Sequence, residues 1–386
     1  MTNSSLRFAL KALPFAVAAA LISGCGVNPE KEYAKGTKAF SDRDFKVASH
    51  CFRTVVKECP ENVDALVMLA RSEFAHGMVS SALEALNAAA ASNGADSDII
   101  ELFAQIAFFT NDYASSEKHY SRLACDASRP KAVRAIGWAG LGVLDFKKIG
   151  QKADAASLCR DSARVKFLKA IDLDPRNTSS RYHLARLYRD SFNYLDMAKE
   201  QFEMFAYLEK DDAEKIRKVR DEIIPSLKAE IANRAASLPG VSRKDPVACA
   251  EFLKKADLQY PKDYKKAKVM YSEAFRRDPT SVAAAMGIIK TLHRPGASKS
   301  DLEEALEVYK KACSISPSSI KLLVGTGDLA VSLGKSALAV EFYSRALALT
   351  PSSRDIVRKL VNSLSKSGNR SLAAIYSGYL EFLSSK

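Results

Sequence analysis

Gly334, Lys335 and Ser336 are of the residue types that hold a phosphate group, and they lie in GTGDLAVSLGKSALAVEFYSRALALTP, from Gly325 to Pro351. In a phosphate-binding loop, glycines let backbone N–H groups approach the phosphates, lysine neutralises their charge and serine binds magnesium. That loop needs a glycine five residues before Gly334, where this chain has Leu329. It must also follow a buried strand, whereas the preceding residues SSIKLLVGTGDLAV are apolar at helical spacing. The sequence therefore predicts a helix and a turn here, and no nucleotide cofactor.

Histidine and cysteine, the usual zinc ligands, are scattered along the chain without the spacing of a metal site or a catalytic motif. Cys51 and Cys59 fall on one predicted helix, roughly 12 Å apart at 1.5 Å per residue, which is too far for a disulfide. We therefore predict no metal, no cofactor and no enzymatic activity, with cysteines used as small apolar residues and long-range disulfides left open. The remaining histidines and cysteines are His50, His76, His119, His183, His293, Cys125, Cys159, Cys249 and Cys313.

The first 25 residues carry the features of an export signal. Arg7 and Lys11 precede an apolar run from Ala12 to Ile22, which is too short to cross a bilayer as a helix. The signal ends in LISGC, which resembles the lipobox of bacterial lipoprotein precursors. The resemblance implies cleavage between Gly24 and Cys25, acylation of the Cys25 thiol, and an outer-membrane location facing the periplasm in an organism with two membranes. An ordinary signal peptide with a chance cysteine is the alternative.

Charge is distributed unevenly along the chain, which has a formal net charge of +13. Residues 25–130 contain 11 Lys/Arg against 15 Asp/Glu, and residues 243–386 contain 24 against 14. The basic C-terminal block indicates an acidic protein partner, an anionic glycan or the membrane surface, and export argues against nucleic acid. A solvated lysine-rich helical surface is the alternative.

A repeated pattern runs through the chain and is clearest where prolines end predicted helices; the last two of these, Pro317 and Pro351, lie 34 residues apart. Each copy has a small residue, an aromatic residue, a second small residue and proline at fixed offsets. Alanine lets two helices approach closely, the ring fills the space one turn later, and proline stops the helix. The copies are Ala48, Phe52, Val55 and Pro60; Ala163, Phe167, Ala170 and Pro175; Ala267, Tyr271, Ala274 and Pro279; Ala305, Tyr309, Ala312 and Pro317; and Ala339, Tyr343, Ala346 and Pro351.

This pattern resembles the tetratricopeptide repeat, a 34-residue helix-turn-helix unit that has a further small residue in its first helix. The resemblance implies an all-α, right-handed superhelical solenoid of antiparallel helix pairs. Units are predicted to begin near residues 29, 63, 97, 131, 178, 248, 280, 320 and 354. Gly77, Gly334 and Gly368 are expected in the turns between paired helices, so that LGKS is such a turn. The small positions of the first helices are Gly36, Ala70, Ala104, Ala185 and Gly327.

The repeats fall into two predicted blocks, at 25–208 and 247–386, after the signal at 1–24. Between them, residues 209–246 lose the pattern and read as a charged helix broken at Pro225, followed by a loop. We expect this segment to join two semi-independent blocks.

Phe40, Phe74 and Phe108 recur every 34 residues, late in the first helices. In the family that position faces the concave groove, and the resemblance implies a partner-binding ladder with Arg71 and Gln105 beside it. Packing of these rings in the core is the alternative. The sequence as a whole predicts a lipid-anchored scaffold that binds an extended peptide or helix of an envelope protein, with an anionic-glycan-binding lipoprotein as the alternative function.

Overall fold

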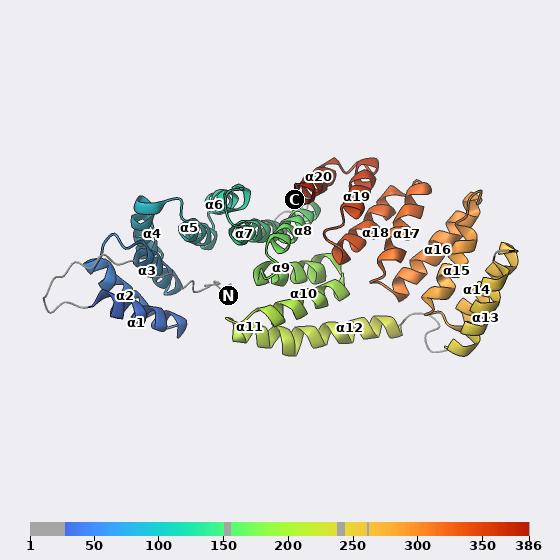
Figure 1. The fold of residues 1–386 in the computed structure, drawn as a ribbon, viewed down its shortest axis with the longest axis horizontal. Helices are drawn as coiled ribbons and strands as arrows, with labels where there is room; N and C mark the ends of the chain where they lie inside the picture. Colours follow the sequence, from blue (N-terminus) through green and yellow to red (C-terminus); the bar gives the residue numbers. More distant parts are fainter. Residues whose placement is uncertain (1–27, 150–155, 238–243, 261, 386) are drawn as a thin grey trace. The chain divides into compact units, whose positions relative to one another are not determined.

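The computed structural model describes residues 28–149, 156–237, 244–260 and 262–385, and it confirms the predicted all-α fold of paired helices. Figure 1 shows these helices in chain order. By their contacts they form two compact units, one running to Leu144 together with Leu173–Asn177, and one comprising Asp145–Asp172 and the chain from Thr178 onward. We call these unit 1 and unit 2 and describe each by itself.

Unit 1 is a stack of helix pairs in which each second helix also packs against the first helix of the next pair. Its helices begin close to the predicted unit starts. They are α1 (Pro29–Ser41), α2 (Phe45–Glu58), α3 (Val63–Ala75), α4 (Val79–Asn93), α5 (Ser97–Phe109), α6 (Tyr113–Cys125) and α7 (Lys131–Ile149), of which the last runs on into unit 2.

Helix starts in unit 1 repeat with the 34-residue period. Asn28, Asn62 and Asp96 each precede a first helix, and each side chain accepts a hydrogen bond from a backbone N–H of the first turn. Such caps satisfy donors that the helix itself leaves unpaired and contribute about 1 kcal/mol each. The period therefore fixes where each first helix begins.

The turns inside the helix pairs use a left-handed residue, as predicted. Gly334 has a φ of 71° between α17 and α18, and Gly77 and Gly368 take the same conformation. Arg43 and Asn111 occupy the equivalent turns of the first and third pairs without glycine. The stretch LGKS is thus a helix-helix turn, with Lys335 at the start of a helix, and the chain upstream of it is helical.

The predicted core positions are buried in all five repeat copies, with every small and aromatic residue at most 7% exposed. The small residue of the first helix is needed because the aromatic ring presses on it. A Cβ added to Gly327 would lie 2.4 Å from the ring of Tyr343, and one added to Gly36 would lie 3.0 Å from Phe52. Each buried ring contributes on the order of 2 kcal/mol, so the repeat pattern is a packing pattern.

Unit 2 contains five further helix pairs in chain order, with α8 at its start and two helices without partners in the repeat pattern (Figure 1). They are α8 (Ala156–Leu173), α9 (Thr178–Leu187), α10 (Leu195–Leu208), α11 (Ala213–Lys218), α12 (Ile224–Ala236), α13 (Pro246–Gln259), α14 (Tyr264–Arg277), α15 (Val282–Leu292), α16 (Lys299–Ile315), α17 (Ile320–Ser332), α18 (Ser336–Leu349), α19 (Arg354–Lys366) and α20 (Arg370–Ser384).

The predicted break at Pro225 is wrong, because the helical path continues from Ala213 to Ala236. A π-helical turn, Val219–Ile223, precedes the proline, and the N–H of Ile224 donates to the carbonyl of Val219 five residues back. The hydrogen-bond register therefore changes directly before Pro225, in the first turn of α12, and this change accommodates a residue that has no N–H to donate.

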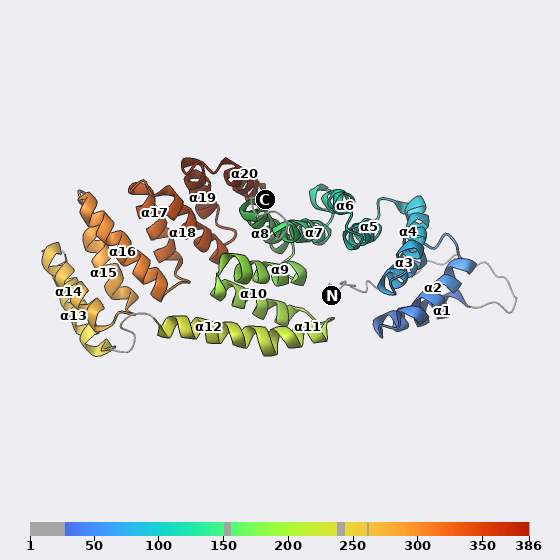
Figure 2. The same cartoon turned by 180° about the vertical axis from the view of Figure 1, so that it is seen from behind.

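The compact units also differ from the two predicted blocks, because α8, α9 and α10 belong to unit 2 together with the C-terminal repeats. In Figures 1 and 2 alike, α8 lies beside α20 at the far end of the repeat array. Helices more than 180 residues apart in sequence thus share one compact unit. Part of the predicted joint, residues 238–243, lies outside the described residues.

Candidate functional site

The first helices of unit 1 carry the same four positions along one side of each of α1, α3 and α5. We call these positions together the first-helix face. Because the positions are spaced i, i+3, i+7 and i+10, they lie along one side of each helix. Aligning the three helices gives rows of equivalent residues, which are Glu30, Asp64 and Asp98; Tyr33, Val67 and Glu101; Thr37, Arg71 and Gln105; and Phe40, Phe74 and Phe108.

Arg71 and Gln105 sit in the middle of this face and contact its acidic residues. The guanidinium of Arg71 lies 3.7 Å from the carboxylate of Asp98 on the next first helix, and its side chain is 12% exposed. The amide of Gln105 donates to the carboxylate of Glu101 at 2.8 Å. Burial, followed by the charge of Asp64, raises the pKa of Tyr33, while Arg71 lowers it. Of the predicted residues, Arg71 thus links two neighbouring first helices, whereas Gln105 bonds within its own helix.

The phenylalanine row is mostly core. Phe40 and Phe74 are each 8% exposed, and Phe40 packs edge-on against Phe45 of α2 at 5.4 Å between centroids. Phe108 is half-buried and packs against Tyr113 at 5.7 Å. The burial of Phe40 and Phe74 favours the core alternative for these two rings, and their role in partner binding stays a prediction.

Phe109, which sequence reasoning missed, is the large aromatic side chain that this face exposes. It is 58% exposed, and its ring stands edge-on against Phe74 with 5.4 Å between centroids. The sequence signal was the doubled phenylalanine at 108 and 109, of which only the first falls on the 34-residue ladder. A ring that is half in solvent and half on a core aromatic is a suitable anchor for an apolar side chain.

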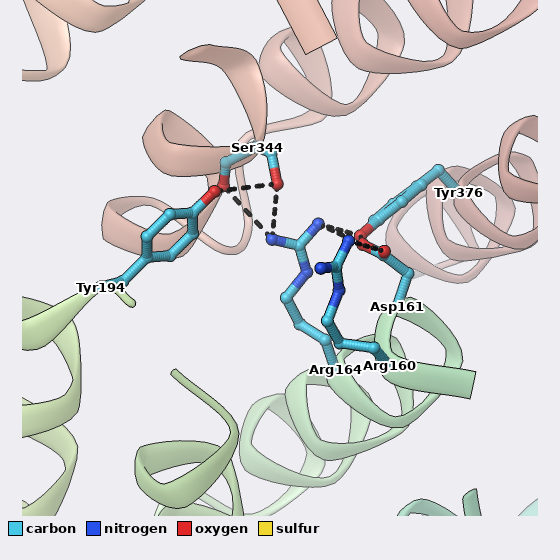
Figure 3. A network of polar contacts seen from close by, with 6 residues as sticks. All are labelled: Arg160, Asp161, Arg164, Tyr194, Ser344 and Tyr376. Atoms are coloured by element: carbon cyan, nitrogen blue, oxygen red, sulfur yellow. Dashed lines mark hydrogen bonds and ion pairs between the residues drawn. The ribbon is translucent and has the colours of Figure 1, made fainter. Parts of the chain in front are cut away.

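A second polar cluster is buried in unit 2, where α8 meets α18 and α20 (Figure 3). The guanidinium of Arg164 is fully buried. It donates to the carboxylate of Asp161 at 2.9 Å, to the hydroxyl of Ser344 at 2.8 Å, and to the hydroxyl of Tyr376. Tyr376 in turn donates to Asp161. We call these four residues the Arg164 centre.

The chemistry of the Arg164 centre is that of a structural ion pair. Burial raises the pKa of Tyr376 well above its usual value, so its hydroxyl stays protonated. Burial alone would lower the pKa of Arg164, but Tyr376 and Asp161 raise it and hold the guanidinium charged. The carboxylate of Asp161 and the hydroxyls of Ser344 and Tyr376 all contact the guanidinium, and these groups show no activated nucleophile or base. The centre ties α8 to the last two helix pairs.

The basic block of unit 2 contains a crevice between α14, α15 and the start of α16. Two of its three cations have partners, because Lys268 lies 2.6 Å from Glu304 and Arg294 lies 3.5 Å from Asp301. Arg294 also stands over the ring of Tyr264, 3.9 Å from its centroid. The residues lining the crevice are Tyr264, Lys265, Lys268, Thr291, Leu292, Arg294 and Asp301.

Within the described residues, histidine, cysteine, aspartate and glutamate form no group of three that could hold a metal ion. Over the same residues, no helix is both long and apolar enough to cross a membrane. Gly24 and Cys25, the predicted cleavage and acylation site, lie outside the described part. The six remaining cysteines are free thiols, with Cys51, Cys249 and Cys313 buried, Cys159 half-buried, and Cys59 and Cys125 exposed.

Comparison with known proteins supports the repeat assignment and little beyond it. No curated protein matches the sequence. Among solved structures, similar chains include PilF of Pseudomonas aeruginosa, PilW, described as a widely conserved type IV pilus biogenesis factor, and the TPR domain of P58(IPK). Their identities are 17%, 16% and 15%, and their TM-scores are 0.38, 0.38 and 0.28. The matches cover 53%, 55% and 89% of this chain and 90%, 94% and 99% of those chains.

TM-scores this low support no argument about function. The family match is more direct, because residues 33–97 fit the family described as tetratricopeptide repeat. That range covers α1 from Tyr33, all of α2, α3 and α4, and the first residue of α5. Beyond it, the same set of buried small and aromatic residues recurs at the same offsets before Pro175, Pro279, Pro317 and Pro351. Residues 33–97 therefore match the tetratricopeptide repeat family, and the packing pattern of that repeat continues in the described residues beyond them.

Proposed function

We propose that this protein is a lipid-anchored scaffold that mediates protein-protein interactions in the bacterial cell envelope, as part of an assembly, secretion or export machinery. The observation that carries the proposal is the first-helix face, on which equivalent residues of three successive helices line up in rows. A stack of helix pairs offers an extended surface of this kind, suited to an extended peptide or a partner helix. The exposed ring of Phe109 supplies an apolar anchor at one edge.

The anchoring part of the proposal rests on the sequence Leu21–Cys25 and on the order of charged, apolar and small residues before it. Cys25→Ser should abolish acylation and release the protein from membranes, because acyl chains are what would hold it there. Cell fractionation with a high-salt wash measures this. Cys59→Ser, which removes an exposed thiol elsewhere, is the matched control and should fractionate like the unaltered protein. Membrane retention of the Cys25→Ser protein would contradict the lipobox assignment.

The scaffold part is tested by photo-crosslinking in cells. Gln105, in the polar row of the first-helix face, is replaced by benzoylphenylalanine, and exposed Glu84 on the second helix α4 serves as the matched position. We expect a defined protein to be captured from position 105 and not from position 84. Equal capture at both positions, or none at either, would count against a partner on this face.

Binding of an anionic glycan by the basic C-terminal block is the second candidate. The crevice lined by Lys265, Lys268 and Arg294 is the observation in its favour. The ion pairs of Lys268 and Arg294 weaken it, because a glycan would have to displace Glu304 and Asp301. Salt-sensitive retention on an anionic polysaccharide, combined with no protein capture, would favour this function over the scaffold.

A further inference from the structure

The first-helix face of unit 1 has acidic groups at one edge and aromatic groups at the other. Glu30, Asp64 and Asp98 stand in the first turns of their helices, and all three are exposed. The phenylalanines stand in the last turns, with Phe109 exposed beside them. A segment that lies across the three helices would therefore meet carboxylates along one side and, on α5, the half-buried ring of Phe108 and the exposed ring of Phe109 along the other.

Stabilisation of the helices does not account for the acidic row. A carboxylate in the first turn interacts favourably with the helix dipole, but it is not required there. In unit 2 the equivalent position of α17 is Lys321, and α17 is formed equally well. The rows of the face contain four carboxylates, those of Glu30, Asp64, Asp98 and Glu101, and one cation, Arg71. Arg71 pairs with Asp98, so the rows carry a net negative charge.

The rows of acidic and aromatic residues stop after α5, and the width of the three helices then sets the length of the segment that could bind. In the next first helix, α7, the corresponding positions are Ala132, Ala135, Ala139 and Gly142, with neither acid nor aromatic ring. Packed helices lie about 8 to 10 Å apart, so three helices span roughly 20 Å between their axes. An extended chain covers that distance with about six to eight residues at 3.3 Å each.

We infer that the first-helix face binds a short extended segment of a protein partner that carries lysine or arginine on one edge and apolar side chains on the other. This inference rests on the proposed scaffold function and names the chemistry of its partner. Side chains of an extended segment alternate between two sides, so alternating basic and apolar residues match the two edges of the face. Charge complementarity selects the segment, and Phe109 packs against its apolar residues.

The test measures binding of fluorescent eight-residue peptides to the full chain in a non-ionic detergent. The probes are one peptide of alternating lysine and leucine, one of glutamate and leucine, and one of lysine and serine. We expect only the lysine-leucine peptide to bind, with an affinity that falls as salt is raised. Asp64→Lys combined with Asp98→Lys should weaken its binding about tenfold or more, and Phe109→Ala should also weaken it.

Matched controls separate the face from general charge and general exposure. Glu58→Lys with Glu84→Lys makes the same charge change on exposed positions of second helices, and Tyr207→Ala removes an exposed ring of unit 2. Both should bind like the unaltered protein. Because Asp98→Lys also removes the partner of Arg71, the neutral pair Asp64→Asn and Asp98→Asn is measured alongside, and circular dichroism checks folding.

Equal binding of the glutamate-leucine peptide, or unchanged binding by the folded Asp64 and Asp98 variants, would overturn the inference. These outcomes are distinct from failure of the proposed function. Capture of a protein from position 105, with no lysine-leucine binding, leaves the scaffold standing and removes the cationic partner. Binding of the lysine-leucine peptide at this face, with no protein captured in cells, supports the chemistry of the face and removes the scaffold.

Discussion

Unit 1 and unit 2 are built from the same helix pairs, but different contacts hold them together. In unit 1 the ion pair across the first-helix face joins neighbours, from Arg71 on α3 to Asp98 on α5. In unit 2 the buried Arg164 on α8 bonds to Ser344, 180 residues further along the chain, and to Tyr376, 212 residues along. One unit is a stack of neighbours, and the other is closed by a contact between its beginning and its end.

This difference bears on function, because the contacts of Arg164 and the first-helix face of unit 1 use different helices of the pairs. The bonds from Arg164 go to α18 and α20, which are the second helices of their pairs. Lys169 of α8 likewise stands over the ring of Phe382 on α20. Closure therefore uses the second helices, whereas the face of unit 1 uses the first helices. Under the proposed function, the protein would hold itself together through one set of helices and bind its partner through the other.

Removing the contacts of the Arg164 centre should have the largest effect on the stability of unit 2. Arg164→Met removes the buried guanidinium and leaves Asp161 with Arg160, 3.2 Å away, as its remaining cation. Loss of one partner from a buried ion pair costs about 3 to 5 kcal/mol, and we expect a cost toward the lower end of that range because Arg160 stays. Hydrogen exchange followed by mass spectrometry should show protection lost in α8, α18 and α20 and kept in α1 to α4. Denaturant titration gives the free energy of unfolding.

The control for Arg164 is Arg220→Met, which removes an exposed arginine of the same unit and should change stability by less than about 0.5 kcal/mol. A second variant, Arg164→Met with Asp161→Leu, removes both charges and should recover part of the loss. Wild-type protection of α18 and α20 in Arg164→Met would mean that the centre does not hold unit 2 closed.

The sequence predicted the local structure well because the 34-residue period is itself a packing pattern. Unit starts, the left-handed turns at Gly77, Gly334 and Gly368, and the buried alanine and aromatic positions all follow from it. The contact between Arg164 and Tyr376 has no period, since it joins one helix to another 212 residues away. An arginine in an amphipathic helix also looks like a solvated residue, so nothing marked it as buried.

The sequence predicted which side of the first helices the phenylalanine ladder occupies, but it did not predict how exposed each ring is. The period placed Phe40, Phe74 and Phe108 on one side of the first helices, but it says nothing of how closely neighbouring helices approach. That approach buries Phe74, while Phe109, one residue beyond the ladder, reaches solvent. Pro225 was misread for a related reason, since a π-helical turn depends on a register change that the sequence does not signal.

A pair of phenylalanine variants sharpens the comparison by separating core from face in unit 1. Phe74→Ala should cost about 3 to 5 kcal/mol of stability, because the ring is 8% exposed and leaves a cavity. Phe109→Ala should cost less than about 1 kcal/mol, since its ring is mostly in solvent, but it should weaken partner binding by on the order of 1 to 2 kcal/mol. Thermal melts and peptide titrations measure the two effects. The reverse pattern would make Phe74 the anchor and restore the predicted ladder.

The smallest effect concerns pH and should appear in unit 1 alone. His119 of α6 stacks on Phe103 of α5, with 5.4 Å between ring centroids, so it takes part in the packing of neighbouring helices. Burial first, and then the charges of Arg122 and Lys118, lower its pKa from 6.5, while Asp112 raises it. Because the folded pKa lies below the unfolded one, the unfolded chain binds more protons between the two values. The stability that His119 contributes is therefore present above about pH 6.5 and is lost as the pH falls toward the folded pKa.

His119→Phe keeps a ring on Phe103 but cannot titrate, so hydrogen exchange in α5 and α6 should depend less on pH between 5 and 7 than in the unaltered protein. His50→Gln, at an exposed position of α2, is the control and should keep the original dependence. If His119→Phe leaves the pH profile of α5 and α6 unchanged, the imidazole does not couple proton binding to the packing of this unit.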